Sequence, residues 1–308
     1  MIAALLATLL FSVSVLSGHR TAKLVGGTEA NFWRLTFATL FLGLWAFLGG
    51  RGVGGVAFTA FFLSGVIGIG IGDAGLFQAL PRLGPRLTVL LNQCLTVPIA
   101  ALIEWLWLGT TLLPLQIFGV VVVLVGVGVA LAPSEHVSIP RRQLVVGVAF
   151  GLLAAFGNAL GVVLSRKAYA IAHAHGETID GGSAAFQRII GGLLLAAVLM
   201  MLLKHRHGNA TAGPTLSGME KWKRIGPWVL LNSLAGQTLG VSAMQWSLET
   251  TPAGISMSII ALTPLAVIPL TRVFGGEKIT VRSVLGGVIA VAGVICLTLT
   301  RLAASKPL

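Results

Sequence analysis

Ten apolar stretches follow one another along the chain, separated by short polar connections. They cover approximately residues 2–18, 28–48, 56–80, 83–108, 113–132, 144–168, 184–203, 225–247, 252–274 and 281–300. Most are long enough for a helix that crosses the hydrocarbon core of a bilayer, which takes about 17 to 25 residues. The apolar runs are continuous rather than alternating, so they favour helices over the strands of a membrane barrel. The pattern therefore predicts an all-α polytopic membrane protein with ten transmembrane helices.

The second half of the chain repeats the first. Residues 78–127 align without a gap onto residues 245–294, a shift of 167 positions. The matched pairs include Gln78 and Gln245, Pro85 and Pro252, Gly119 and Gly286, and Gly126 and Gly293. Further upstream, Phe32-x-Arg34 matches Phe186-x-Arg188 at a shift of 154. Internal repeats in an apolar chain are typical of transporters built from two halves. We therefore divide the chain into two five-helix repeats, residues 1–133 and 134–308.

The composition is that of a membrane protein. Of the 308 residues, 56% are hydrophobic and only 10% are charged, and the mean hydropathy is +0.94. The connections are too short to contain a soluble catalytic domain, so any chemistry would take place inside the membrane. An enzyme there would need at least two ionisable groups at one depth, and Asp73 is essentially the one such group deep in the predicted helices, so we expect no enzyme activity. Residues 2–18 could be mistaken for a signal peptide, but no basic stretch precedes them, and we expect them to be retained as the first helix.

The chain is strongly basic, with a formal net charge of +12. In a soluble protein this would indicate nucleic acid as a partner, but here the basic residues lie in loops and at helix ends, where they set topology and contact anionic lipid. Fifteen of the 21 Lys and Arg residues follow the first, third, fifth, seventh and ninth predicted helices or flank those connections. The positive-inside rule then places both termini outside the cytoplasm.

Several short motifs carry a family resemblance. They are Gly72-Asp73 with Gln78 and Pro85 in the first repeat, and Thr251-Pro252-Ala-Gly254, Leu262-Thr263-Pro264 and Gly275-Gly276-Glu277-Lys278 in the second. In order and spacing they resemble EamA-like members of the drug/metabolite transporter superfamily. The resemblance implies two inverted five-helix repeats in a bacterial inner membrane. It also implies a cavity lined mainly by the first, third, fourth, sixth, eighth and ninth helices, and export or uptake of small metabolites.

Two departures from the family accompany the resemblance. The first repeat has Thr110 where the second has Glu277, so the first copy is the more degenerate. Family members usually have both termini in the cytoplasm, against the charge count above. The orientation therefore stays open.

Asp73 is the most informative polar residue inside an apolar stretch. It lies seven residues before the end of the predicted helix 56–80, or about 10 Å deep at about 1.5 Å per residue. A charge placed near the middle of a bilayer costs about 2.5 to 3.5 kcal/mol on insertion scales. Asp73 is then either a cavity carboxylate that binds a cationic substrate group or carries a proton, or a paired residue that holds helices together.

A set of smaller polar residues lies on the helices that the resemblance assigns to the cavity. Amide side chains donate and accept hydrogen bonds at once, which suits zwitterions, sugars or nucleobases. Each of them could instead make an interhelical hydrogen bond worth about 0.6 kcal/mol. The set consists of Asn92, Gln93, Asn158, Asn232, Gln237, Gln245 and Thr263. For Arg34 and Arg188 we favour a structural role, with the guanidinium groups reaching toward the headgroups.

Glycine and proline positions predict how the halves move. Small residues four apart, at Gly68 and Gly72 and at Gly236 and Gly240, let helix backbones approach closely and slide. Pro98 and Pro264 interrupt the backbone hydrogen-bond ladder and offer bending points; static packing kinks are the alternative. The sequence has no phosphate-binding loop, dinucleotide motif or cysteine cluster, and we expect no cofactor, no catalytic residue and no metal site.

The sequence thus predicts a secondary transporter that works by alternating access on a small-molecule substrate, an amino acid or related compound first, most simply by export. Proton coupling through Asp73 is one interpretation. The alternatives are an intramembrane lipid-modifying enzyme and a passive pore or scaffold protein. The substrate, the direction, the coupling ion, and whether the protein is a monomer or a homodimer stay open.

Overall fold

The computed structural model describes residues 1–131, 140–207, 218–263, 265–267 and 281–304. Within these ranges the regular structure is helical and contains no strand. The elements are α1 (Ile2–Val25), α2 (Gly27–Leu48), α3 (Phe58–Gly65), η1 (Val66–Gly72), α4 (Asp73–Leu108), α5 (Pro114–Leu131), α6 (Arg141–Ala174), α7 (Gly181–His207), α8 (Gly218–Asn232), η2 (Ser233–Gly240), α9 (Val241–Thr250), α10 (Ala253–Ile260) and α12 (Val281–Ala304). The all-α class predicted from the sequence is confirmed.

Six helices in the described ranges are long and apolar enough to cross a membrane. They span Ile2–Ala22, Gly27–Leu48, Phe58–Leu76, Leu91–Leu108, Arg141–Ala174 and Gly181–Leu202. Three shorter apolar helices lie at Pro114–Ala130, Ala253–Val267 and Val284–Leu297. The protein is therefore a polytopic membrane protein, and the full count of ten spans stays a prediction.

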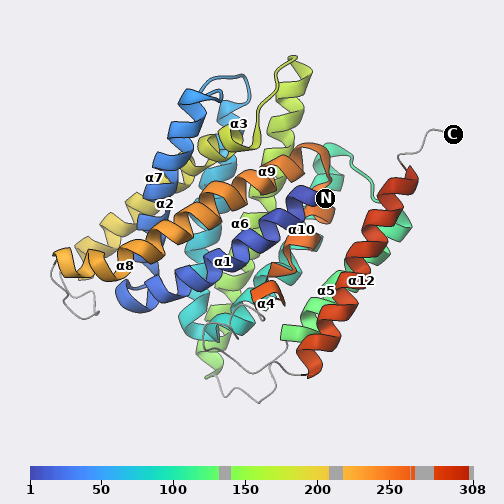
Figure 1. The fold of residues 1–308 in the computed structure, drawn as a ribbon. Helices are drawn as coiled ribbons and strands as arrows, with labels where there is room; N and C mark the ends of the chain where they lie inside the picture. The colour runs from blue at the N-terminus through green and yellow to red at the C-terminus, as the bar shows by residue number, and fades with distance from the viewer. Residues whose placement is uncertain (132–139, 208–217, 264, 268–280, 305–308) are drawn as a thin grey trace.

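The predicted helices 56–80 and 83–108 are drawn as one helical run, α3, η1 and α4, in place of two separate helices. The run nevertheless changes direction relative to α6. The contacts, in chain order, are Gly68 with Gly161, Leu83 with Gly147, Leu91 with Gly151, and Glu104 with Arg166. The residue numbers of these partners on α6 fall from Gly161 to Gly147 and then rise through Gly151 to Arg166. The chain therefore doubles back between residues 83 and 91. Both legs pack along α6, which stands near the centre of the bundle (Figure 1).

Two π-helical segments lie at matching places in the two halves. The segment η1 begins at Val66, and η2 begins at Ser233, which is the same position in the second repeat at the shift of 167 residues. A π turn widens the helix and leaves its backbone hydrogen bonds irregular, and such turns occur often at functional sites. The shared irregularity makes η1 and η2 the natural places to look for the site.

Each π segment packs against the first helix of the opposite half. Gly72 lies against Gly157 of α6, and a Cβ atom built on Gly161 would come within 2.6 Å of the Cα of Gly68. In the same way η2 packs on α1, where Gly236 lies beside Ser14. Gly240 lies beside Phe11 of α1. Between η1 and α6 the backbones touch directly, whereas Gly236 and Gly240 of η2 leave room for the side chains of Ser14 and Phe11.

Helices α5 and α12 form a pair at one edge of the bundle (Figure 1). Gly119 packs on Gly293, and Gly126 packs on Gly286. Gly119 matches Gly286 in the repeat, and Gly126 matches Gly293, so each glycine contacts the repeat mate of the other. An antiparallel pair with this exchange of partners is what a two-fold axis between inverted repeats produces.

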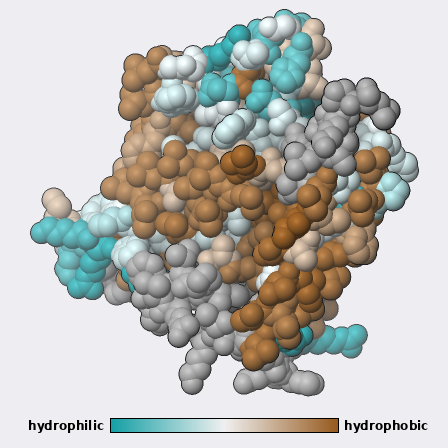
Figure 2. All heavy atoms as spheres, turned by 45° about the vertical axis from the view of Figure 1, so that its right-hand side comes forward, coloured by the Kyte–Doolittle hydropathy of each residue, from teal (hydrophilic) through white to brown (hydrophobic). Residues whose placement is uncertain are grey.

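The outer surface is apolar over wide areas. Figure 2 shows a broad hydrophobic surface, with hydrophilic side chains gathered toward its ends. On α12 the side chains of Val288 and Leu299 are 64% and 61% exposed. An exposed apolar surface of this extent is expected where the neighbour is lipid.

Candidate functional site

An ion pair lies inside the bundle, between α2 and the first residue of α4. Nη2 of Arg34 is 2.7 Å from Oδ2 of Asp73, and the two side chains are 17% and 15% exposed. The same Nη2 donates a hydrogen bond to Oδ1 of Asn31, one turn earlier on α2. The pair is close enough for a charge-assisted hydrogen bond, which is about twice as strong as a neutral one. Asp73 is thus a paired carboxylate in this conformation.

Asp73 follows directly on η1, so the π segment determines where the carboxylate lies. Gly72, the last residue of η1, lies against the side chain of Asn158 on α6. Nδ2 of Asn158 donates a hydrogen bond to Oδ1 of Asn92 on the returning leg of α4, at 3.1 Å. The structure therefore brings Asn92 and Asn158 together, next to the residue that precedes Asp73.

Three more of the predicted polar residues lie on α8, η2 and α9. Asn232, which ends α8, accepts a hydrogen bond from Oγ of Ser14 on α1 at 2.6 Å. Gln237 in η2 is 8% exposed and Gln245 in α9 is 0% exposed. Within the described ranges, Oε1 of Gln237 and both polar side-chain atoms of Gln245 have no hydrogen-bond partner. Buried amides without partners are rare in folded proteins, so these groups are candidates to bind something else.

The remaining predicted residues are less informative. Oγ1 of Thr263 donates to the carbonyl oxygen of Ile260, an internal bond of the helix end. Gln93 is partly buried on α4. Pro98 is exposed within α4, which continues past it to Leu108. Pro264 lies outside the described residues.

The sequence analysis left Glu104 and Arg166 out of the candidate site. Nε of Arg166 is 2.7 Å from Oε1 of Glu104, whose side chain is 2% exposed. The second oxygen of Glu104 accepts a hydrogen bond from the backbone N–H of Ala253, at the start of α10. Nη1 of Arg166 donates to the carbonyl oxygens of Leu248 and Thr251. The pair thus joins α4, α6 and the turn between α9 and α10.

A signal for this pair is present in the sequence. Each residue lies close to the end of its predicted helix, Glu104 in 83–108 and Arg166 in 144–168, and the charges are opposite. They meet only because the returning leg of α4 runs parallel to α6. That relation depends on the tertiary fold, which the hydropathy pattern does not contain.

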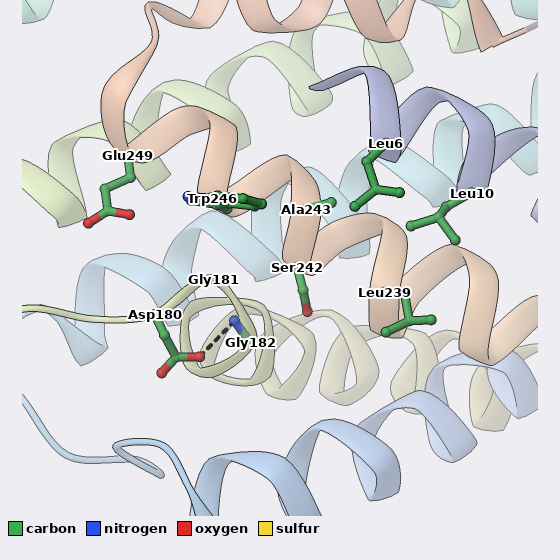
Figure 3. Close-up of a pocket in the computed structure, with 10 residues that line it drawn as sticks. All are labelled: Leu6, Leu10, Asp180, Gly181, Gly182, Leu239, Ser242, Ala243, Trp246 and Glu249. Carbon is green, nitrogen blue, oxygen red and sulfur yellow. Dashed lines mark hydrogen bonds between the residues drawn. The ribbon is translucent and has the colours of Figure 1, made fainter. Parts of the chain in front are cut away.

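A hollow lies on another part of the molecule, between α1, the η2–α9 run and the beginning of α7 (Figure 3). Its volume is about 560 Å³. The lining residues are Leu6, Leu10, Asp180, Gly181, Gly182, Leu239, Ser242, Ala243, Trp246 and Glu249. Neither Asp73 nor Arg34 is among them, so this hollow is separate from the ion pair.

Asp180 in this hollow has a structural role at the beginning of α7. Its Oδ1 accepts hydrogen bonds from the backbone N–H groups of Gly182 and Ser183 and from Nε1 of Trp45 on α2. Partial burial acts to raise the pKa of Asp180, but the hydrogen bonds from Ser183, Trp45 and Gly182 outweigh it and lower the pKa below 3.8. Asp180 is therefore a charged helix cap at neutral pH.

Within the described ranges, no group of three or more His, Cys, Asp or Glu residues is placed to hold a metal ion. The buried polar groups described above belong to Arg, Asp, Asn and Gln side chains that are not clustered as metal ligands are. This arrangement suits the recognition of a small polar molecule by hydrogen bonds and charge.

The paired π segments, the exchanged glycine contacts and the buried ion pair define a membrane protein built from two helical repeats. The family model of the EamA-like transporter family matches residues 1–132 and 145–299. The chain therefore belongs to the EamA-like transporter family, as the motif resemblance predicted, and it is a multi-pass membrane transporter. No curated protein matches the chain. One solved crystal structure aligns over 99% of this chain and 98% of its own, with 16% sequence identity and a TM-score of 0.75; at that identity the likeness concerns the fold alone.

Proposed function

We propose that this protein is a secondary transporter that exports a small metabolite, an amino acid or a related compound, by alternating access. In this proposal the two halves rock about a central site, and Asp73 is the coupling residue. The observation that carries the proposal is the ion pair of Arg34 and Asp73 inside the bundle.

The ion pair supports coupling because its energy depends on the charge of Asp73. Removing one charge from a pair of this kind leaves the other uncompensated, which is costly where water is scarce. A proton on Asp73, or a cationic substrate group that competes with Arg34, would therefore weaken the contact between α2 and α4. A change of binding state would in this way alter which conformation is preferred.

The glycine contacts support a movement at the same place. Gly68 and Gly72 pack on Gly161 and Gly157 immediately before Asp73 along the chain. Smooth contacts between backbones can slide without removing large side chains from their pockets. In the other half, glycines of η2 also face α1, where Gly236 meets the side chain of Ser14 and Gly240 that of Phe11.

The proposal is tested by reconstitution of the purified protein into liposomes. A panel of amino acids and of their N-acetyl derivatives is supplied outside, with and without an imposed proton gradient, and the amount inside is measured over time. A coupled transporter accumulates at least one compound above its outside concentration, and the accumulation disappears when a protonophore removes the gradient. Equilibration without accumulation would identify a passive pore, and entry no faster than in empty liposomes would count against the proposal.

A further inference from the structure

The two repeat-matched arginines differ in their surroundings. Arg34 has an acidic partner in Asp73 and an amide partner in Asn31. Arg188 is 2% exposed, and within the described ranges its Nε and Nη1 have no hydrogen-bond partner. The Arg188 guanidinium lies beside Gly68, with Nη2 only 3.2 Å from a Cβ atom built there.

The difference follows from the residues that the second repeat has at the matching positions. At the shift of 167 residues Asp73 corresponds to Gly240, and at the shift of 154 residues Asn31 corresponds to Ala185. Neither Gly240 nor Ala185 has a side chain that could accept a hydrogen bond. The second repeat has therefore kept the arginine without the groups that neutralise it.

Asp73 does not supply a full counter-charge for Arg188, although its charge attracts Arg188 as well as Arg34. Among the described residues, Asp73 is the carboxylate that acts on the Arg188 guanidinium, and it is already paired with Arg34, so one positive charge is left without a full counter-charge. A buried arginine with free N–H donors and no full counter-charge is unfavourable. It is the arrangement expected where a ligand supplies the missing negative charge.

Tyr169 of α6 provides a second donor for such a ligand. It is 1% exposed, and its hydroxyl has no hydrogen-bond partner within the described ranges. Tyr169 and Arg188 both pack on α3: the ring of Tyr169 lies edge-on to Phe61, and the backbone of Arg188 lies against Gly65, one turn further along. The carboxylates of Glu249 and Asp180 also act on Tyr169, but Glu249 lies 3.6 Å from His173 and Asp180 caps α7. A guanidinium and a phenol hydroxyl can together donate to the oxygens of one carboxylate.

From these observations we infer that Arg188 and Tyr169 bind the carboxylate of a monoanionic substrate. The inference rests on the proposed function and specifies the class of compound. One negative charge balances the one uncompensated arginine. A zwitterionic amino acid brings no net charge, and a phosphate dianion brings more than the site neutralises. Carboxylates without a charged amino group, such as N-acylated amino acids, fit best.

The site is closed in this conformation. Gly68 of η1 and Gly161 of α6 lie against each other beside the Arg188 guanidinium. Access therefore requires α3 and η1 to move relative to α6, and the glycine contact between them is the place where such a movement meets the fewest side chains.

The test measures binding separately from transport. The probes are the N-acetyl derivatives of alanine, leucine and phenylalanine, each compared with its neutral C-terminal amide and with the free amino acid. The thermal unfolding midpoint of the full-length protein in lipid nanodiscs is followed as each compound is added, and dissociation constants are taken from the midpoint shifts. At least one N-acetyl acid is expected to bind about 10-fold or more tightly than its amide.

The variants separate a binding role from a structural one. Tyr169→Phe removes a hydroxyl that has no hydrogen-bond partner among the described residues, so it leaves the unliganded midpoint unchanged or slightly raised and weakens acid binding by about 5-fold. Arg188→Gln abolishes the preference for the acid, and Arg188→Lys retains part of it. Arg224→Gln, at an exposed pair with Glu220, is the control and binds as the wild type does.

The outcomes distinguish this inference from the proposed function. Equal binding of acids and amides, tighter binding of the free amino acids, or undiminished acid binding by both Tyr169→Phe and Arg188→Gln would overturn the carboxylate site. Acid binding that is lost in these variants supports it, even if liposomes show no transport of the bound probe. That last result would count against the transporter proposal alone.

Discussion

Gly286 of α12 packs directly on the carbonyl oxygen of Gly126 in α5. The two positions are not repeat mates: Gly286 matches Gly119 and Gly126 matches Gly293, and those two mates pack on each other in turn. For Gly287, the next residue of α12, no atom of the described residues lies within 4 Å of a Cβ built on it. The neighbouring glycines therefore form a matched pair for testing the α5–α12 contact.

We expect Gly286→Ala to separate α5 from α12 and to lower the free energy of unfolding by about 1 to 3 kcal/mol, the usual cost of overpacking. Gly287→Ala has room for its methyl group and raises helix propensity by up to about 1 kcal/mol. Thermal unfolding of both variants in the same detergent measures the difference. Equal midpoints for the two variants would show that the pair does not pack as described.

The buried pair of Glu104 and Arg166 is the second place to test. Glu104→Ala leaves Arg166 without a counter-charge and the N–H of Ala253 without its acceptor, and removing one partner of a buried pair costs about 3 to 5 kcal/mol. The double variant Glu104→Ala with Arg166→Met loses less than the sum of the single losses. Glu220→Ala is the control, because its pair with Arg224 is exposed and is worth at most about 1 kcal/mol. Additive losses in the double variant would contradict a direct pair.

Asp180 predicts a pH dependence at the beginning of α7. Asp180→Ala removes the helix cap and is expected to cost about 1 kcal/mol at pH 7, while Asp180→Asn, which keeps an acceptor oxygen, costs less. Because hydrogen bonds hold the pKa below 3.8 in the folded protein, the charged cap stabilises the fold above that pH, and its contribution is lost as the pH falls through the lowered pKa.

The measurement is the unfolding midpoint of wild type and Asp180→Ala from pH 8 to pH 3. The difference stays constant down to about pH 5 and shrinks below about pH 4. A difference that grows on acidification would show that the protonated side chain, and not the carboxylate, caps α7.

The sequence predicted the fold best where the apolar runs and the internal repeat give the same answer. Apolar runs define helices because a bilayer requires every backbone group to be bonded within the segment, and the matched glycines of α5 and α12 then met across the pair. The π segments were not predicted, because a stretch such as Gly65 to Gly72 has the same composition whether its turns are α or π. Among the predicted site residues, Asp73 lies in an ion pair with Arg34, and its role stays a prediction.

The pairing of charges depended on geometry that the sequence does not contain. Arg34 and Arg188 look alike in sequence, and we favoured the same structural role for both. Only the fold places Asp73 against Arg34 and, in the part of the chain that the structure describes, leaves Nε and Nη1 of Arg188 without hydrogen-bond partners. Local sequence patterns identify the charged groups whose burial costs free energy, but the partners of these groups come from helices far apart in the chain.

The central claim is that the Arg34–Asp73 pair takes part in transport. The most direct measurement compares the metabolites released by cells that produce wild type, Asp73→Asn or Glu29→Gln at equal membrane abundance, with empty cells as the baseline. Glu29→Gln is the control, since it too removes the carboxylate of an ion pair. Glu29 lies near the beginning of α2 and pairs with Lys221, not with Arg34. We predict a compound that wild type and Glu29→Gln release and that Asp73→Asn releases at least about 10-fold more slowly, which corresponds to about 1.4 kcal/mol. Equal release by Asp73→Asn and wild type would contradict the claim and leave the pair a structural contact.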